Sequence, residues 1–238
     1  MTSSFIYLLI CHFIGDYYLQ TSALSTRKNS EFKGLLIHSV LYMMPFLSIL
    51  FLGTFYSRFD TLFFLGVIWM THFLVDALKS YISRHFTNRR HEEISYLLDQ
   101  GLHLLILYGL SVSLFRFDLI SLGSTINVIL RWVLYILLIL KPANVTFRIV
   151  FARYQSNDAD DDSIRGAGTM IGSLERLLMA LMIGLQQFSA IGLVLTAKSI
   201  ARYDKISKRP AFAEYFLIGT LYSTIATVLL YILLFRVF

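Results

Sequence analysis

The sequence has little of what a soluble or disulfide-bonded domain depends on. Only 15% of its 238 residues are Asp, Glu, Lys or Arg, whereas soluble domains average roughly 25%. Its single cysteine, Cys11, excludes an internal disulfide. The first residues, MTSSFIYLLI, lack the basic start and the small-residue cleavage site of a secretory signal, so we expect a retained first helix.

What the chain does contain is apolar sequence in long runs. Hydrophobic residues make up 56% of the chain and the mean hydropathy is +0.65. The runs approach the ~20 residues that a helix needs to cross a bilayer, and they lack the alternation of barrel strands. Because an open sheet is excluded in lipid, the sequence predicts an all-α, polytopic integral membrane helical bundle with about six to seven membrane segments.

The polar stretches divide the chain into three parts. We predict a membrane core at 1–141, a polar cytoplasmic loop at 142–172 and C-terminal membrane helices at 173–238. Pro45 is expected to kink the second helix, and Lys141-Pro142 to end the fifth. The predicted apolar segments are 3–24, 34–52, 61–79, 98–115, 124–141, 173–195 and 213–236.

The basic residues of the loops predict the orientation in the membrane. Lys and Arg concentrate at 25–33, 80–97 and 142–165, which the positive-inside rule assigns to the cytoplasm of a bacterial inner membrane. This bias accounts for the net charge of +6, so no nucleic-acid partner is expected. The rule fails at the basic segment 196–212 if 173–195 crosses completely, and the sequence leaves that crossing open.

Polar residues recur at helical spacing inside three apolar segments. They are His12, Asp16 and Gln20 in HFIGDYYLQ; His72, Asp76 and Lys79 in THFLVDALK; and Asp99 and His103 in DQGLH. At these intervals each set shares one helix face. Polar groups inside a membrane are costly, so such stripes indicate a functional site.

The predicted topology brings these stripes, together with His38 and Gln100, to the same depth near the cytoplasmic interface. Imidazole and carboxylate without thiolate favour an open zinc, manganese or iron site over a closed structural one. The candidate metal ligands are His12, Asp16, His38, His72, Asp76, Asp99 and His103. The candidate catalytic residues are Asp16, Asp76, Asp99 and Lys79, and the supporting residues are Gln20, Gln100, Glu175 and Arg176.

Simpler interpretations remain open for several of these residues. Asp76 and Lys79 could form only an intrahelical ion pair, as could Glu175 and Arg176 in GSLERLL. A histidine such as His38 can be a packed core residue. Gln20 and Gln100 could be amides that join neighbouring membrane helices.

The motifs HFIGDYYLQ, LLIHSVLY, HFLVDALK and LLDQGLHLL resemble a bacterial inner-membrane family known as a domain of unknown function. The C-terminal GSLERLL, IGLVLTAKSIARY and EYFLIGTLYS look like an extension found in many members. More remotely, the His/Asp helices are similar to putative membrane-bound metal-dependent hydrolases, and through them to zinc-dependent phospholipase C and related nucleases. That remote resemblance implies hydrolytic metal chemistry.

Three functions follow as hypotheses. The first is a metal-dependent hydrolase of a phosphoester, such as a lipid headgroup, with one carboxylate acting as general base. The second is a transporter that carries protons or a cation through the same residues. The third is a membrane scaffold or sensor without catalysis. The oligomeric state and the number of metal ions stay open.

Overall fold

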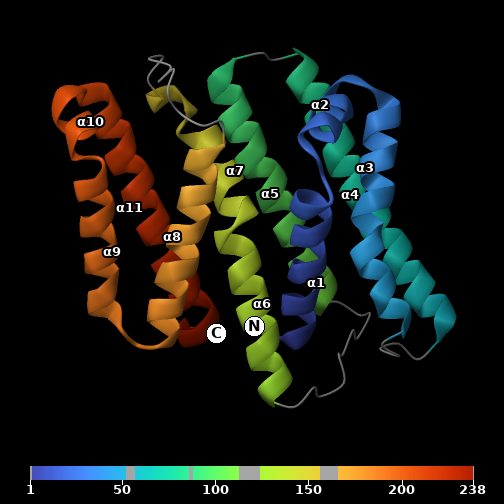
Figure 1. The fold of residues 1–238 in the computed structure, drawn as a ribbon. Coiled ribbons are helices and arrows are strands. Elements are labelled where there is room, and N and C mark those ends of the chain that lie inside the picture. The colour runs from blue at the N-terminus through green and yellow to red at the C-terminus, as the bar shows by residue number, and fades with distance from the viewer. Residues whose placement is uncertain (1, 52–56, 86–87, 113–123, 156–165, 238) are drawn as a thin grey trace. The chain divides into compact units, whose positions relative to one another are not determined.

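A computed structural model describes residues 2–51, 57–85, 88–112, 124–155 and 166–237 (Figure 1). These ranges form helices and turns and contain no strand, which confirms the all-α prediction. Five helical stretches within them are long and apolar enough to cross a membrane, as expected of an integral membrane protein. These stretches are Phe32–Phe51, Arg58–His85, Thr125–Val150, Ala167–Gly184 and Pro210–Val237.

The described chain divides into two compact units, residues 1–134 and 135–238. Unit 1 contains α1 (Ser3–Phe13), the π-helical turn η1 (Ile14–Tyr18), α2 (Ser22–Ser30), α3 (Phe32–Phe46), the 3-10 turn η2 (Leu47–Phe51), α4 (Arg58–His85), α5 (Arg89–Val112) and the first part of α6 (Ser124–Ile139). Unit 2 contains the end of α6, α7 (Lys141–Val150), the 3-10 turn η3 (Ala152–Tyr154), α8 (Ala167–Gly184), α9 (Phe188–Ala201), α10 (Tyr203–Lys208), α11 (Pro210–Ile232) and the π-helical turn η4 (Leu233–Val237).

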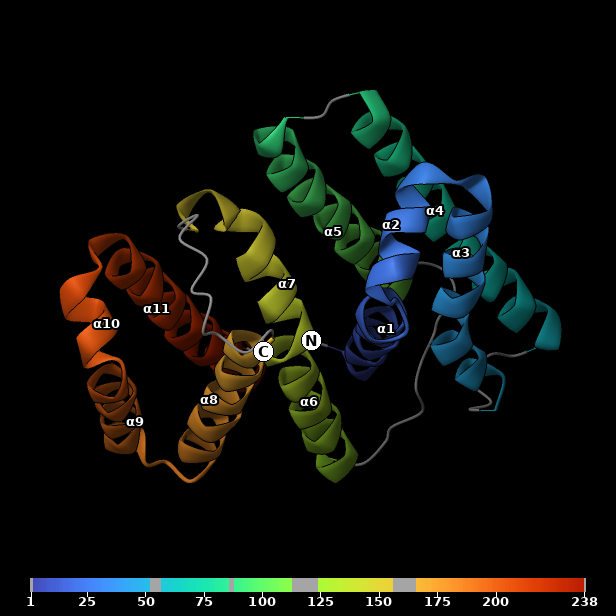
Figure 2. The ribbon, with the colours of Figure 1, turned by 45° about the horizontal axis from the view of Figure 1, so that its top comes forward.

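Unit 1 is a bundle in which α3 and α5 run opposite to α1 and α4 (Figures 1 and 2). The short polar helix α2 begins at Thr21, whose side chain accepts a hydrogen bond from the Leu24 N–H, and ends at the extended residue Glu31. It packs on α3 and α4 at one end of the bundle. Pro45 leads α3 into the 3-10 turn η2, where the sequence predicts a kink.

The interior of unit 1 has two layers along the helix axes. An apolar layer is built from every principal helix and consists of Leu8, Cys11, Tyr42, Phe46, Ile49, Phe64, Leu65, Ile68 and Leu107. About one helical turn toward α2, the buried positions become His12, His38, His72 and His103. The same faces that build the core therefore carry the polar residues.

Two predicted membrane segments differ from the structure in unit 1. The segment predicted at 3–24 is divided among α1, η1 and the start of α2, because a π-turn interrupts the helix after Phe13. Of the segment predicted at 98–115, residues 98–112 belong to α5 and 113–115 lie outside the described ranges. Helix α5 is long enough to cross but too polar to count among the five apolar stretches. Its polar site residues lower its hydropathy.

In unit 2 the helix predicted at 173–195 is two antiparallel helices, α8 and α9 (Figure 1). Gln186, with a φ of 59°, reverses the chain between them. The basic segment 196–212 therefore lies at the same end of unit 2 as the start of α8 (Figures 1 and 2). The predicted conflict with the positive-inside rule assumed that 173–195 is one crossing, and this stretch is not a single helix.

The stretch predicted as a polar loop, 142–172, is helical at both of its ends. Pro142 lies in the first turn of α7, where a missing N–H costs no helical hydrogen bond, so the predicted stop after 141 is also a helix start. A packed apolar cluster in unit 2 consists of Met179, Ile183 and Ile191. Residues 156–165 of the predicted loop lie outside the described ranges.

Candidate metal centre

Unit 1 gathers most of the predicted site residues in its polar layer. Asp16 comes from η1, His38 from α3, and His72 and Asp76 from α4. His12 comes from α1, and Asp99, Gln100 and His103 come from α5. All of them except Gln100 are buried, so the polar cluster is closed off by protein.

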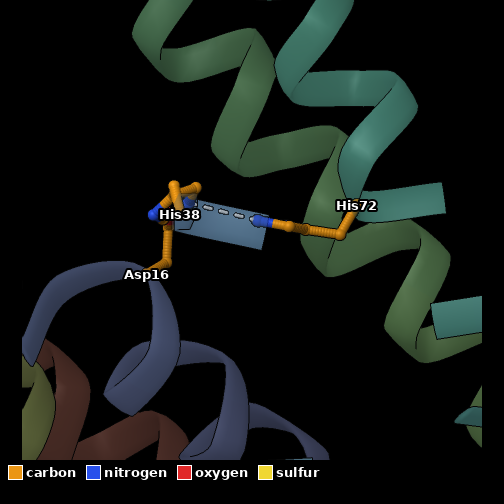
Figure 3. A group of neighbouring side chains, drawn as sticks. All are labelled: Asp16, His38 and His72. Atoms are coloured by element: carbon orange, nitrogen blue, oxygen red, sulfur yellow. Dashed lines mark hydrogen bonds and ion pairs between the residues drawn. The ribbon is translucent and has the colours of Figure 1, made fainter. Parts of the chain in front are cut away.

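At the centre of this cluster three atoms form a nearly equilateral triangle. The Nε2 atoms of His38 and His72 are 3.3 Å apart, and each lies 3.2 Å from Asp76 Oδ2. Asp16 Oδ1 lies 3.3 Å from the same His38 nitrogen. Figure 3 shows His38 and His72 pointing toward each other, with Asp16 on the neighbouring helical segment.

These distances match the edges of a coordination polyhedron. Ligands about 2.0–2.1 Å from a tetrahedral zinc ion lie roughly 3.3 Å from one another. An octahedral magnesium ion at the same ligand distance has shorter edges of about 2.9 Å. The triangle therefore has the dimensions of one face of a tetrahedral zinc site.

Hydrogen bonds among the described residues can satisfy the Nε2 atoms of both imidazole rings but not their Nδ1 atoms. If both Nε2 atoms carry hydrogen, His38 can donate to Asp16 at 3.3 Å and His72 to Asp76 at 3.2 Å. If only one does, the lone pair of the other faces the Asp76 carboxylate. The Nδ1 atoms of both rings are buried and have no hydrogen-bond partner among the described residues, which is unusual for buried polar atoms.

Two groups of three residues, called the two triads below, have ligand atoms within 4.8 Å of one another and could hold a metal ion. One group is Asp16, His38 and His72, and the other is His72, Asp76 and His103. His103 Nδ1 lies 2.9 Å from the Asp99 carbonyl oxygen and donates to it, while its Nε2 is buried without a partner in the described chain. That tautomer leaves a lone pair on Nε2, the form that binds metals.

The aromatic ring of Tyr42 holds the orientation of His72. The two rings are stacked with centroids 3.4 Å apart and planes 3° apart. Gly15 makes room for Tyr42, because a Cβ at this glycine would lie 2.8 Å from the Tyr42 carbonyl oxygen. His72 is therefore fixed by packing as well as by its polar contacts.

His12 and Asp99 lie beside the two triads and belong to neither. His12 contacts the Tyr42 hydroxyl at 3.2 Å and Gln100 Oε1 at 3.4 Å. Asp99 accepts hydrogen bonds from Lys79 at 2.7 Å and from Gln100 at 3.1 Å. Both predicted ligands thus contribute to the network around the triads in this structure.

The amide of Gln100 joins the two carboxylates on either side of it. Its Nε2 donates to Asp16 Oδ2 at 2.8 Å as well as to Asp99, so this amide links helices, as one simpler interpretation expected. Gln20 lies beyond the π-turn and is partly buried. His12, Asp16 and Gln20 therefore do not form one continuous α-helical face.

Lys28 is the residue of this cluster that sequence reasoning missed. The sequence assigns it to a basic loop, yet it is only 4% exposed and donates to both Asp76 carboxylate oxygens at 2.9 Å. Burial alone would lower the pKa of its ammonium, but the nearby Asp76 and Asp16 carboxylates raise it above its ordinary value. A weak signal existed, since Thr21 is a good helix cap and a helix from it buries one face.

Asp76 and Lys79 have separate partners in place of the intrahelical pair considered from the sequence. Asp76 pairs with Lys28, whereas Lys79 pairs with Asp99 across to α5. The Lys79 side chain is 20% exposed. Its partial exposure connects the cluster to the surface of unit 1.

Glu175 and Arg176 belong to unit 2 and have partners there. Glu175 accepts a hydrogen bond from Lys198 at 2.7 Å. Arg176 donates to the Ile139 carbonyl, to Ser223 Oγ at 3.2 Å and to Asn144 Oδ1 at 2.6 Å. The two residues thus have partners other than each other, unlike the pair that the simpler interpretation left open, and both lie in unit 2.

No curated protein and no solved structure matches the chain. One family model does match, and it covers residues 4–142, which include the entire polar cluster of unit 1. This agrees with the resemblance carried by the motifs in that part of the sequence. The chain therefore belongs to the family described as "Protein of unknown function (DUF3307)".

Proposed function

We propose that unit 1 is a metal-dependent hydrolase that acts on a phosphoester at the cytoplasmic side of a bacterial inner membrane. The observation that carries the proposal is the triangle of His38 Nε2, His72 Nε2 and Asp76 Oδ2, with edges of 3.2–3.3 Å. A divalent ion would bind these three closely spaced ligand atoms together. Zinc suits the nitrogen and oxygen donors and the spacing best.

The fourth ligand, beside the three atoms of the triangle, would come from Asp16 or His103. Each of these two residues belongs to one of the two triads. Asp16 Oδ1 is already 3.3 Å from His38 Nε2, and His103 has an unpaired Nε2 among the described residues. Whichever of the two stays free of the metal is placed to accept a proton from a water molecule. A bound metal with an open position supplies hydroxide near neutral pH and polarises a phosphoryl oxygen.

The charge of the cluster favours an anionic substrate. Its buried carboxylates, Asp16, Asp76 and Asp99, exceed its ammonium groups, Lys28 and Lys79, by one negative charge when the imidazoles are neutral. A divalent ion would convert this into one net positive charge in a buried site. Since an uncompensated buried charge is costly, the loaded site would favour an anion such as a phosphate group.

The charge of Lys79 would favour the approach of an anionic substrate from one side of the polar layer. Its ammonium, partly exposed and 2.7 Å from Asp99, can attract a phosphate and place it next to the buried ligands. On the opposite side of the polar layer lies the apolar layer that includes Phe46, Phe64 and Ile68. A polar layer that ends in packed apolar residues supports a closed site over a transport path.

The first test is the metal content of the full chain purified in detergent, measured by elemental analysis. Wild type should hold stoichiometric zinc, and His72→Ala should lose it while keeping the helical circular dichroism spectrum. His85→Ala is the matched control, because His85 is an exposed histidine on the same helix. A folded wild type that stays metal-free after zinc is added back would contradict the proposal.

The second test measures hydrolysis of bis-p-nitrophenyl phosphate and of phospholipid in vesicles. Both activities should disappear with EDTA and return with zinc, and Lys79→Met should raise KM more than it lowers kcat. If zinc is bound but neither substrate is cleaved, ion flux in proteoliposomes becomes the deciding measurement. Flux that Asp76→Asn abolishes would replace the hydrolase with the transporter.

A further inference from the structure

Lys28 is an unusual residue for the position it occupies. Lysine is among the residues least often fully buried, and the rest of α2 is mostly exposed. The Lys28 ammonium nevertheless reaches both oxygens of Asp76 at 2.9 Å and lies 3.9 Å from Asp16 Oδ1. A short polar helix thus delivers one cation into the polar layer of unit 1.

Several contacts hold the end of α2 in the position that brings the Lys28 ammonium to Asp76. Ser80 Oγ donates to the Lys28 carbonyl at 3.3 Å, and Arg84 Nε donates to the Asn29 carbonyl at 2.8 Å. Gly34 lets α3 approach closely, because a Cβ there would lie 2.5 Å from the Arg27 carbonyl. The position of Lys28 is therefore specified by backbone contacts, independently of its charge.

The ammonium and the proposed metal ion would share one oxygen atom. Asp76 Oδ2 is the oxygen that faces both His38 and His72, and it also accepts from Lys28. A metal on this oxygen would have a positive charge beside it in a buried site, where repulsion between cations is strong. A lysine that served only to orient the carboxylate would bind the other oxygen and leave Oδ2 to the metal.

We propose that Lys28 is a built-in counter-cation that competes with the metal ion for Asp76 and so sets the metal affinity of the site. This inference rests on the proposed metal centre. In the metal-free protein Lys28 neutralises the buried carboxylates and keeps the polar layer folded. When a metal binds, the ammonium loses its contact with Oδ2 and keeps its contact with Oδ1, while the backbone contacts hold α2 in place.

The test is a zinc titration against a competing chelator, using the full chain in detergent. Lys28→Met removes the charge while keeping most of the side-chain volume, and it should bind zinc about tenfold more tightly or better than wild type. Lys28→Arg keeps the charge and should stay near wild type. Lys33→Met is the matched control, because Lys33 is an exposed lysine at the start of α3.

Unchanged or weaker zinc binding by Lys28→Met would overturn the inference. If wild type binds zinc and the variant binds no more tightly, the metal centre stands and only the role of Lys28 falls. If no folded variant binds zinc, both proposals fall. Should Lys28→Met not fold, Lys28→Gln is compared by thermal unfolding, where zinc should raise the midpoint further than in wild type and an equal or smaller rise contradicts the inference.

Discussion

The two units differ in how completely their buried polar groups are paired by hydrogen bonds. Unit 1 buries more ligand atoms than its own hydrogen bonds can use, and Nδ1 of His38, Nδ1 of His72 and Nε2 of His103 lack partners among the described residues. In unit 2 the guanidinium of Arg176 donates to a carbonyl, a hydroxyl and an amide oxygen. The same kind of costly group is incompletely paired in one unit and well paired in the other.

The contacts of Arg176 explain why unit 2 buries a charge. The chain breaks between α6 and α7 at Leu140, so Ile139 is the last residue of α6 and its carbonyl is available to accept a bond from Arg176. A cation at a helix C-terminus is favoured by the helix dipole. Arg176 thus stabilises a helix break, a structural role that needs no ligand.

Buried polar residues in a membrane protein can serve the fold or a ligand, and the two units illustrate this difference. Where every donor and acceptor has a partner, the residue is accounted for by the fold. Where ring nitrogens crowd around one carboxylate oxygen, as those of His38 and His72 do around Asp76 Oδ2, the fold brings ligand atoms together. This difference predicts that substitutions in the two units will affect stability and metal content separately.

The largest expected effect comes from breaking the buried ion pair of unit 1. Asp76→Ala leaves the Lys28 ammonium without its bidentate partner, which should lower the free energy of unfolding by about 3–5 kcal/mol. Unfolding in detergent, followed by circular dichroism, measures this loss. Adding Lys28→Met to Asp76→Ala should recover part of the stability, and a double variant less stable than the single one would contradict the ion-pair account.

The next largest loss of stability is expected from removing the Arg176 side chain, which donates to the carbonyl at the end of α6 in unit 2. Arg176→Ala leaves the Ile139 carbonyl and the Asn144 amide oxygen without their donor, and should cost about 2–3 kcal/mol. Its zinc content should equal that of wild type. Arg148→Ala, at an exposed position of α7, is the control and should be near neutral. Loss of zinc in folded Arg176→Ala would remove the distinction between the units.

A smaller effect is expected where α2 meets α3. Gly34→Ala would place a methyl group 2.5 Å from the Arg27 carbonyl, and should cost about 1–3 kcal/mol because the backbone of α2 must shift. Gly66→Ala in α4 has open space and should gain about 0.5–1 kcal/mol from helix propensity. Thermal unfolding compares the two, and equal midpoints would show that α2 does not need its close approach.

The smallest effect is expected at the partly exposed ion pair of unit 2. Glu175→Gln removes the partner of Lys198, whose side chain is 19% exposed, and should cost only about 0.5 kcal/mol. Chemical denaturation of the variant and wild type in the same detergent measures this difference. A loss as large as that of Arg176→Ala would mean that unit 2 also depends on a specific charge pair.

Composition and spacing were enough to predict the class of fold and most residues of the polar layer. Helical spacing places His72 and Asp76 on one face wherever that helix packs, and loop charge assigns the stripes to one depth. The family membership follows from the same residues. These properties depend on local periodicity and composition, which a single sequence records.

Which polar groups meet depends on how the helices pack. The tertiary structure placed Lys28 in the cluster, separated the Glu175 and Arg176 partners, and divided 173–195 at Gln186. Composition could not predict these results, because a lysine in a charged segment is indistinguishable from its solvated neighbours until another helix covers it. The triangle of His38, His72 and Asp76 likewise depends on the packing of two helices, since its edges join atoms 34 or more residues apart as well as four apart.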